Sequence, residues 1–243
     1  MPRDSRNHRA EFNTTRWSIV LAAGRVDSPS SRHALAHLCA AYWYPLYAYA
    51  RRRGHRADQA EDFTQSFFAR FLEKHDVQDA DRARGKFRNF LLASFKNFLA
   101  NEHDRNTAKK RGGEFAFESI DSANAEHRYA SLPHSLSPEQ EFEQQWALSM
   151  LETVVKQLEA EYTCAGKAPL FSLLKEFLPG SASELTYRQC ADSLSVSEAA
   201  VKMAVLRLRR RYRQVLREQI ADTLPPDGSI DEEIRYLLSI IGA

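Results

Sequence analysis

Seven basic residues and no acidic ones occur between residues 202 and 217. Guanidinium and ammonium groups gathered on one segment bind phosphates, so the chemistry that they indicate is attachment to a nucleic-acid backbone. The alternative is a surface helix whose charges are only solvated.

The elements that must position these side chains favour nucleic-acid binding. Apolar residues recur at helical spacing through the basic segment, which predicts a helix with one buried side. Ser197 can cap this helix, and residues 195–197 make a short turn after another helix, with Ser195 where glycine is usual. A short turn followed by a basic amphipathic helix is typical of a unit that inserts its second helix into the major groove of DNA. The apolar positions are Cys190, Ala191 and Leu194 in the first helix and Val201, Ala204, Val205 and Leu208 in the second.

Composition sets the class of protein. The chain has 243 residues, 43% of them hydrophobic, and no apolar run approaches the roughly 20 residues that cross a bilayer. Its three cysteines lie far apart and its first residues are polar, so we expect reduced thiols and a cytoplasmic location. The net charge is only +2, so any affinity for nucleic acid must come from local clusters.

Three aromatic-rich segments, residues 32–53, 56–74 and 85–105, predict helices in the N-terminal half. Pro45 should bend or break the first helix, and Gly54 should end it. Their apolar stripes can be buried against one another, which predicts one helical domain.

The predicted fold class is all-α, with two helical domains joined by a flexible linker and a helix-turn-helix in the second. Residues 107–137 combine a basic cluster, two adjacent glycines and Pro133, and Pro138 follows them, which is a composition typical of linkers. A short amphipathic helix follows Pro225 and Pro226, with apolar positions at Ile230, Ile234, Leu237, Leu238 and Ile241. The predicted divisions are a polar arm, a first domain, the linker, a second domain and an extension, at 1–13, 14–106, 107–137, 138–222 and 223–243.

An enzyme is not indicated. His33 and His37 are four residues apart, as zinc ligands can be, but no second pair of ligands has the matching spacing. Asp58, Glu61 and Asp62 cluster at the start of a helix, where the helix dipole favours negative charge. We therefore expect no catalytic residues, no metal and no cofactor.

A polar and basic side of the third helix can bind nucleic acid. Its residues Lys96, Asn97, Asn101 and Arg105 lie beside several phenylalanines. Such a surface can hold unstacked bases and follow a backbone.

The order of these segments resembles the extracytoplasmic-function (ECF) sigma factors of bacterial RNA polymerase, over about residues 14–222. The aromatic segments are similar to those of the planctomycete-type group. In that family an acidic and aromatic helix binds the clamp of core polymerase. The residues that match it here are Asp62, Phe63, Gln65, Ser66 and Phe68, with Ser66 where an acidic residue is commoner.

The same resemblance implies two DNA-binding sets. Lys96, Asn97, Asn101 and Arg105 would bind the start-proximal promoter element, although Asn101 replaces a usual aspartate and Asp104 a usual arginine. The recognition helix would bind the distal element, with Leu206 where histidine is common. Its residues are Ser197, Glu198, Ala199, Lys202, Met203, Arg207, Arg210 and Arg211.

The resemblance implies a sigma factor that binds core RNA polymerase and directs promoter recognition and transcription initiation. Its partners would be core RNA polymerase, promoter DNA and an anti-sigma factor or other regulator, without a membrane. The first alternative is a free-standing helix-turn-helix regulator with an N-terminal sensing domain, which would bind duplex DNA alone. A more distant alternative is a helical metal-dependent hydrolase.

Overall fold

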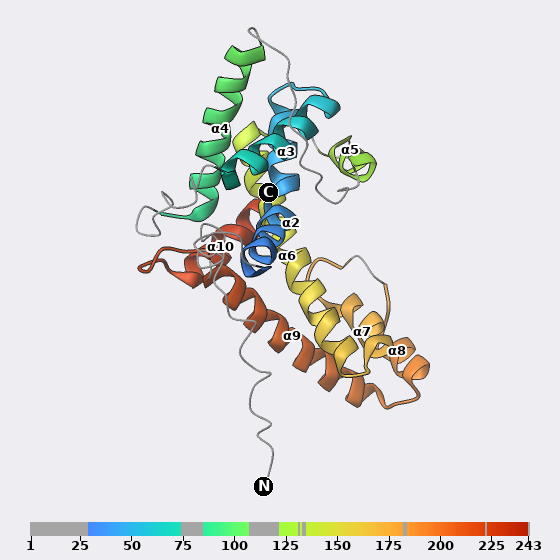
Figure 1. The fold of residues 1–243 in the computed structure, drawn as a ribbon. Coiled ribbons are helices and arrows are strands. Elements are labelled where there is room, and N and C mark those ends of the chain that lie inside the picture. Colours follow the sequence, from blue (N-terminus) through green and yellow to red (C-terminus); the bar gives the residue numbers. More distant parts are fainter. Residues whose placement is uncertain are drawn as a thin grey trace. The chain divides into compact units, whose positions relative to one another are not determined.

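The computed structural model describes residues 29–73, 85–106, 122–130, 132, 135–181, 184–221 and 223–242. These residues form helices and no strand, which confirms the all-α fold class (Figure 1). The predicted arm, residues 1–13, and residues 107–121 of the predicted linker lie outside the described residues. The helices are α2 (Pro29–Arg52), α3 (Ala57–Glu73), α4 (Phe87–Asn106), α5 (Ser122–Ala130), α6 (Pro138–Cys164), α7 (Ala168–Leu174), the 3-10 helix η2 (Lys175–Phe177), α8 (Tyr187–Leu194), α9 (Glu198–Ala221) and α10 (Ile230–Ile241).

The chain divides into two compact units. The first unit comprises the described residues up to Ala147 together with those from Ile220 onward, and the second unit comprises Leu148–Gln219. The divisions therefore fall inside α6 and near the end of α9, whereas we predicted boundaries at residues 138 and 222. The first turns of α6 and the C-terminal extension belong to the first unit.

Helix α2 forms the centre of the first unit. From Ala41 to Ala50 every side chain is buried except that of Tyr44, which is half-buried. A helix that is apolar on all sides must lie within a core, because no side of it is suited to water. The break expected at Pro45 does not occur, since α2 continues to Arg52. Gly54, with φ of 91°, follows its end as predicted.

An aromatic cluster joins α3 to α4. The ring of Phe67 lies 5.4 Å from that of Phe71, 5.1 Å from that of Phe95 and 5.7 Å from that of Phe98, measured between centroids. All four side chains are buried. The predicted apolar stripes of these two helices are therefore confirmed at these positions.

Part of the predicted linker is helical. Helix α5 is fixed to α2 by Glu126, whose carboxylate accepts hydrogen bonds from Arg51 Nη2 at 2.6 Å and Nε at 2.9 Å. The hydroxyl of Tyr47 donates to the same carboxylate. Burial and this contact with Glu126 raise the pKa of Tyr47. Residues 122–130 are consequently an ordered component of the first unit.

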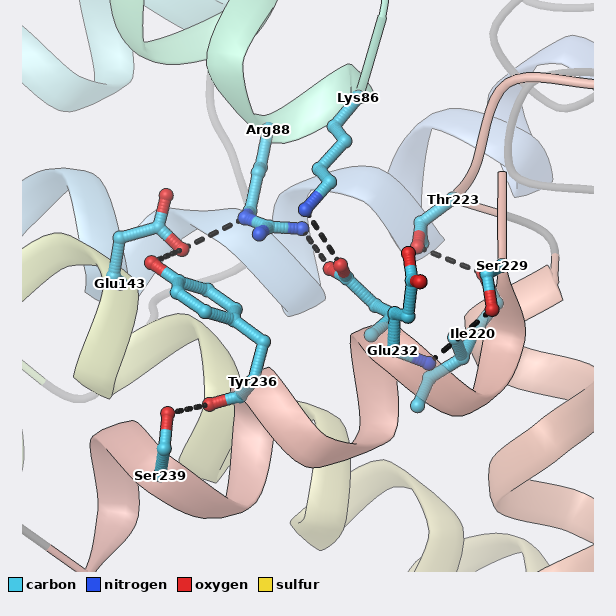
Figure 2. A network of polar contacts seen from close by, with 10 residues as sticks. Lys86, Arg88, Glu143, Ile220, Thr223, Ser229, Glu232, Tyr236 and Ser239 are labelled. Carbon is cyan, nitrogen blue, oxygen red and sulfur yellow. Dashed lines mark hydrogen bonds and ion pairs between the residues drawn. The ribbon is translucent and has the colours of Figure 1, made fainter. Parts of the chain in front are cut away.

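The C-terminal helix α10 packs on the first unit through a buried ionic network (Figure 2). Arg88, 2% exposed, donates to Glu143 Oε2 at 2.7 Å and to Glu233, and Lys86 Nζ lies 2.6 Å from Glu233 Oε2. The guanidinium carbon of Arg88 lies 4.2 Å from the centroid of the Trp146 ring. The network thus links the start of α4 to α6 and α10.

The apolar stripe predicted for α10 is wrong in one respect. Leu237 is fully buried as expected, but Leu238 is 56% exposed. Glu233 occupies the buried side instead, one turn before Leu237, because its carboxylate is paired with two cations.

Candidate nucleic-acid interface

A helix, a turn of residues 195–197 and a second helix follow one another in the second unit, as the sequence predicted. Helix α8 begins at a capping box, in which Thr186 Oγ1 accepts from Gln189 N–H and Gln189 Oε1 accepts from Thr186 N–H. It ends at Ser195, which is left-handed with φ of 53° and ψ of 41°. Glycine adopts this backbone conformation most easily, which explains why glycine is usual at this position of the turn. The assignment of α8 and α9 as a DNA-binding motif stays a prediction.

Helix α9 begins as predicted. The side chain of Ser197 accepts a hydrogen bond from Ala200 N–H at 3.2 Å. The predicted buried side is also confirmed for Val201, Val205 and Leu208, and Tyr212 extends it by one turn. Cys190 and Ala191 of α8 are buried as well, so this side of α9 belongs to the core of the second unit.

The opposite side of α9 exposes large apolar side chains beside cations. Met203 and Leu206 are each 50% exposed, and the neighbouring Lys202, Arg207 and Arg210 are exposed too. In a DNA groove, apolar side chains contact the methyl group of thymine, and cationic side chains donate hydrogen bonds to base acceptors. The other predicted members, Ser197, Glu198 and Ala199, are exposed in the first turn.

Two predicted contact residues, Lys202 and Glu198, are paired with each other. The Lys202 ammonium lies 2.7 Å from the Glu198 carboxylate, one helical turn away. The hydrogen bond that Lys202 donates to this carboxylate raises the pKa of the ammonium group. Both side chains are about half exposed, so a nucleic-acid acceptor can replace Glu198 without desolvating a buried group.

The arginines of α9 differ in their environments. Arg209 donates twice to the carbonyl oxygen of Phe177, and Arg211 forms a two-point pair with Glu161. The bonds between Arg211 and Glu161 raise the pKa of the guanidinium and lower that of the carboxyl. Within the described part of the chain, Arg207, Arg210 and Arg213 make no hydrogen bond or ion pair. Of the two adjacent arginines in the predicted recognition-helix set, Arg210 is thus available for DNA and Arg211 is held by Glu161.

The polar side of α4 is partly engaged. Lys96 Nζ lies 2.6 Å from Glu139 Oε1 at the start of α6, and the hydrogen bond from Lys96 lowers the pKa of Glu139. Asn97 and Asn101 are exposed, whereas the side chain of Arg105 lies outside the description. Phe95 and Phe98 are buried, so they cannot stack on bases. Lys96 also lines a cavity of about 570 Å³, together with Tyr49, Arg53, His55, Leu99, Ala100 and Glu139.

The predicted polymerase-binding residues separate into surface and core. Asp62 and Ser66 are exposed on α3, while Phe63 and Gln65 are half-buried. Gln65 donates to Glu61, and the ring of Phe63 meets that of His55 edge to face. Phe68 is only 2% exposed and packs against Phe67, so it is a core residue of the isolated chain, and its contact with a partner stays a prediction.

Sequence reasoning missed the residues that hold the basic helix in place. Phe177 and Glu161 bind two of its arginines, and Tyr187 stacks on Phe177. The only available signal was the aromatic or acidic character of these side chains. They share no motif spacing with α9.

Two further findings concern other classes of function. The described residues contain no group of three or more histidine, cysteine, aspartate or glutamate side chains that could hold a metal ion. Nor does any helix among them have the length and apolar composition to span a membrane. His33 and His37 lie on α2, but their side chains fall outside the description.

No family model, curated protein or solved structure matches the chain.

Proposed function

We propose that the chain is a sigma factor that binds core RNA polymerase and directs promoter recognition and transcription initiation. The observation that carries this proposal is the exposed side of α9, where Met203 and Leu206 stand beside Lys202, Arg207 and Arg210. Exposed apolar side chains that lie together on one side of a helix often mark an interaction site. Met203 and Leu206 lie beside cations on a helix that follows a short turn, and this arrangement suits insertion into a DNA groove.

In this proposal, the first turns of α9 contact base edges. Lys202 would leave Glu198 and donate to a base acceptor, while Met203 and Leu206 would contact thymine methyl groups. Arg207 and Arg210 would bind phosphates and fix the position of the helix on the duplex. Arg211 would contribute little, because Glu161 already neutralises it.

The first unit would serve the other two roles of a sigma factor. Asp62 and Ser66 would contact core polymerase, since they are the exposed members of the predicted docking set. Lys96, Asn97 and Asn101 would contact the start-proximal element, with Lys96 exchanging Glu139 for a phosphate. Such a protein would work in the cytoplasm, and an anti-sigma factor or another regulator would be a further partner.

The deciding experiment is transcription from genomic DNA by purified core polymerase, with and without the chain, followed by mapping of the RNA 5′ ends. A sigma factor creates new start sites that share two upstream elements. A variant with both Asp62→Ala and Ser66→Ala should lose them while it keeps its helical circular dichroism spectrum. If the chain binds duplex DNA tightly without polymerase and creates no start sites, it is a free-standing regulator and the proposal is wrong.

A further inference from the structure

Phe177 connects three helical elements of the second unit. It is the last residue of η2, and its carbonyl oxygen accepts from Arg209 Nη2 at 2.7 Å and from Nε at 2.9 Å. Its ring stacks on that of Tyr187, the first residue of α8, with centroids 4.7 Å apart and an interplanar angle of 3°. One residue is therefore bound to α9 through its backbone and to α8 through its side chain.

The two bonds from Arg209 are favourable for a local reason. The chain leaves η2 at Leu178, which is extended with ψ of 155°, so the Phe177 carbonyl has no following turn to bind. The C-terminal end of a helical segment carries partial negative charge and attracts a cation. A planar guanidinium also fixes direction, because two of its N–H groups share one acceptor.

The same side of α9 holds a predicted base-contacting residue. Lys202 precedes Arg209 by seven residues, which is close to two helical turns, so both side chains lie along one side of the helix. The Lys202 ammonium lies 5.7 Å from the centroid of the Tyr187 ring. The Tyr187 ring thus lies beside Lys202, while Arg209 is bonded to the backbone carbonyl of Phe177, whose ring stacks on that of Tyr187.

We infer that Arg209 is a positioning residue: through Phe177 and Tyr187 it fixes α9 relative to α8, and so aligns Lys202 and Met203 for base recognition. This inference rests on the proposed function and adds a specificity-determining residue to it. It also means that Arg209 is not a phosphate contact, although the residue is cationic and lies within the basic segment.

The test compares Arg209→Lys with Arg210→Lys, each in the full chain bound to core polymerase. Both substitutions keep the charge, but only the first removes the two-point bond to Phe177. The probes are the duplex that the wild-type holoenzyme enriches from a randomised pool and the same duplex with its sequence shuffled. Affinity for each probe is measured over a salt series, well below the unfolding temperature of each variant.

We expect Arg209→Lys to reduce the preference for the enriched duplex about tenfold, the size of one misaligned base contact. Its affinity for the shuffled duplex and its salt dependence should stay unchanged. Arg210→Lys should keep the preference, whereas Arg210→Ala should reduce the slope of log affinity against log salt by about 0.9.

A second variant guards against misfolding of the first. Tyr187→Leu removes the ring stack without altering any charge, and it should reduce the preference to the same extent. If both variants lower only the unfolding temperature and keep the wild-type preference, Arg209 is merely structural and the inference is wrong. If the wild-type holoenzyme enriches no sequence at all, the proposed function fails, and this inference fails with it.

Discussion

The guanidinium of Arg52, at the end of α2, lies 2.6 Å from the carboxylate of Glu141, in the first turns of α6. The Glu141 side chain is fully buried and that of Arg52 is 10% exposed. Glu141 also accepts a hydrogen bond from Gln145 at 2.9 Å. The stability of the fold depends on these partners of Glu141, because an unpaired charge in a core is costly.

Glu141→Ala should therefore destabilise the protein by about 3–5 kcal/mol, the range for removal of one member of a buried ion pair. Urea unfolding followed by circular dichroism measures this change. Arg56→Ala is the matched control, because Arg56 and Asp58 form a pair with side chains 79% and 63% exposed. The control should change stability by less than about 1 kcal/mol. Equal effects of the two substitutions would contradict the buried pairing.

The contact of Glu126 with α2 should depend on pH. Partial burial raises the pKa of Glu126, but hydrogen bonds from Arg51 and Tyr47 outweigh burial and lower it overall. Its contribution to stability should thus be complete above the unfolded-state value of about 4.3 and be lost as the pH falls through the lower folded-state value. The difference in unfolding free energy between wild type and Glu126→Gln should be constant near neutral pH and shrink in acid. A difference that grows in acid would refute the assigned pairing.

Asp62 and Phe68, six residues apart on α3, should respond differently to substitution by alanine. Asp62→Ala should weaken binding to core polymerase with little change in stability, because the side chain is exposed. Phe68→Ala should cost about 3–5 kcal/mol of stability, because it leaves a cavity in the aromatic core. Surface plasmon resonance with immobilised core polymerase, together with thermal unfolding, separates the two effects. Unchanged binding by Asp62→Ala would reject this docking surface.

Lys202 should determine which promoters are used. Lys202→Ala should change relative affinities within a panel of upstream-element variants by about 1–3 kcal/mol, the value of a good base contact. An equal loss on every variant would show that Lys202 contacts only the backbone.

Arg211 should differ from its neighbour Arg210. Arg211→Ala should lower the unfolding temperature, because it leaves Glu161 without its cation, yet it should keep the salt dependence of DNA binding. A salt slope reduced as much as that of Arg210→Ala would mean that Arg211 leaves Glu161 to bind DNA.

Helix α10 should be protected from amide hydrogen exchange in the isolated chain. An isolated helix of this length is marginal in water, so protection requires its contacts with the first unit. Glu233→Ala should abolish this protection, since it leaves Lys86 and Arg88 without their shared carboxylate. Ser239→Ala, on the exposed side of the same helix, should leave it intact. Fast exchange in the wild type would contradict the packing of α10.

Local patterns predicted much of the fold. The spacing of Phe67, Phe71, Phe95 and Phe98 identified two helices and their buried sides, because helical periodicity depends only on nearby residues. The capping by Ser197 was predictable for the same reason. The break at Pro45 was misjudged, since the loss of one backbone hydrogen bond is outweighed by the buried residues on both sides of it.

Long-range pairing could not be predicted from the sequence. Arg88 is a charged residue that a sequence pattern places on the surface, but it is buried because Glu143 and Glu233 meet it from distant segments. Residues 209–211 are all arginine, so the sequence does not distinguish them. Successive residues of a helix point about 100° apart, so the three side chains have different surroundings. Only the residues that surround each arginine in the fold show which of the three is available to bind DNA.

The return of residues 220–242 to the first unit has a consequence for synthesis on the ribosome. Glu233 is made 145 residues after its partner Arg88. At about 5–20 residues per second, this delay is on the order of ten seconds. During it the second unit is translated completely, while the nascent first unit still exposes the surface that α10 will cover. That interval is when the growing chain is open to chaperones and to aggregation.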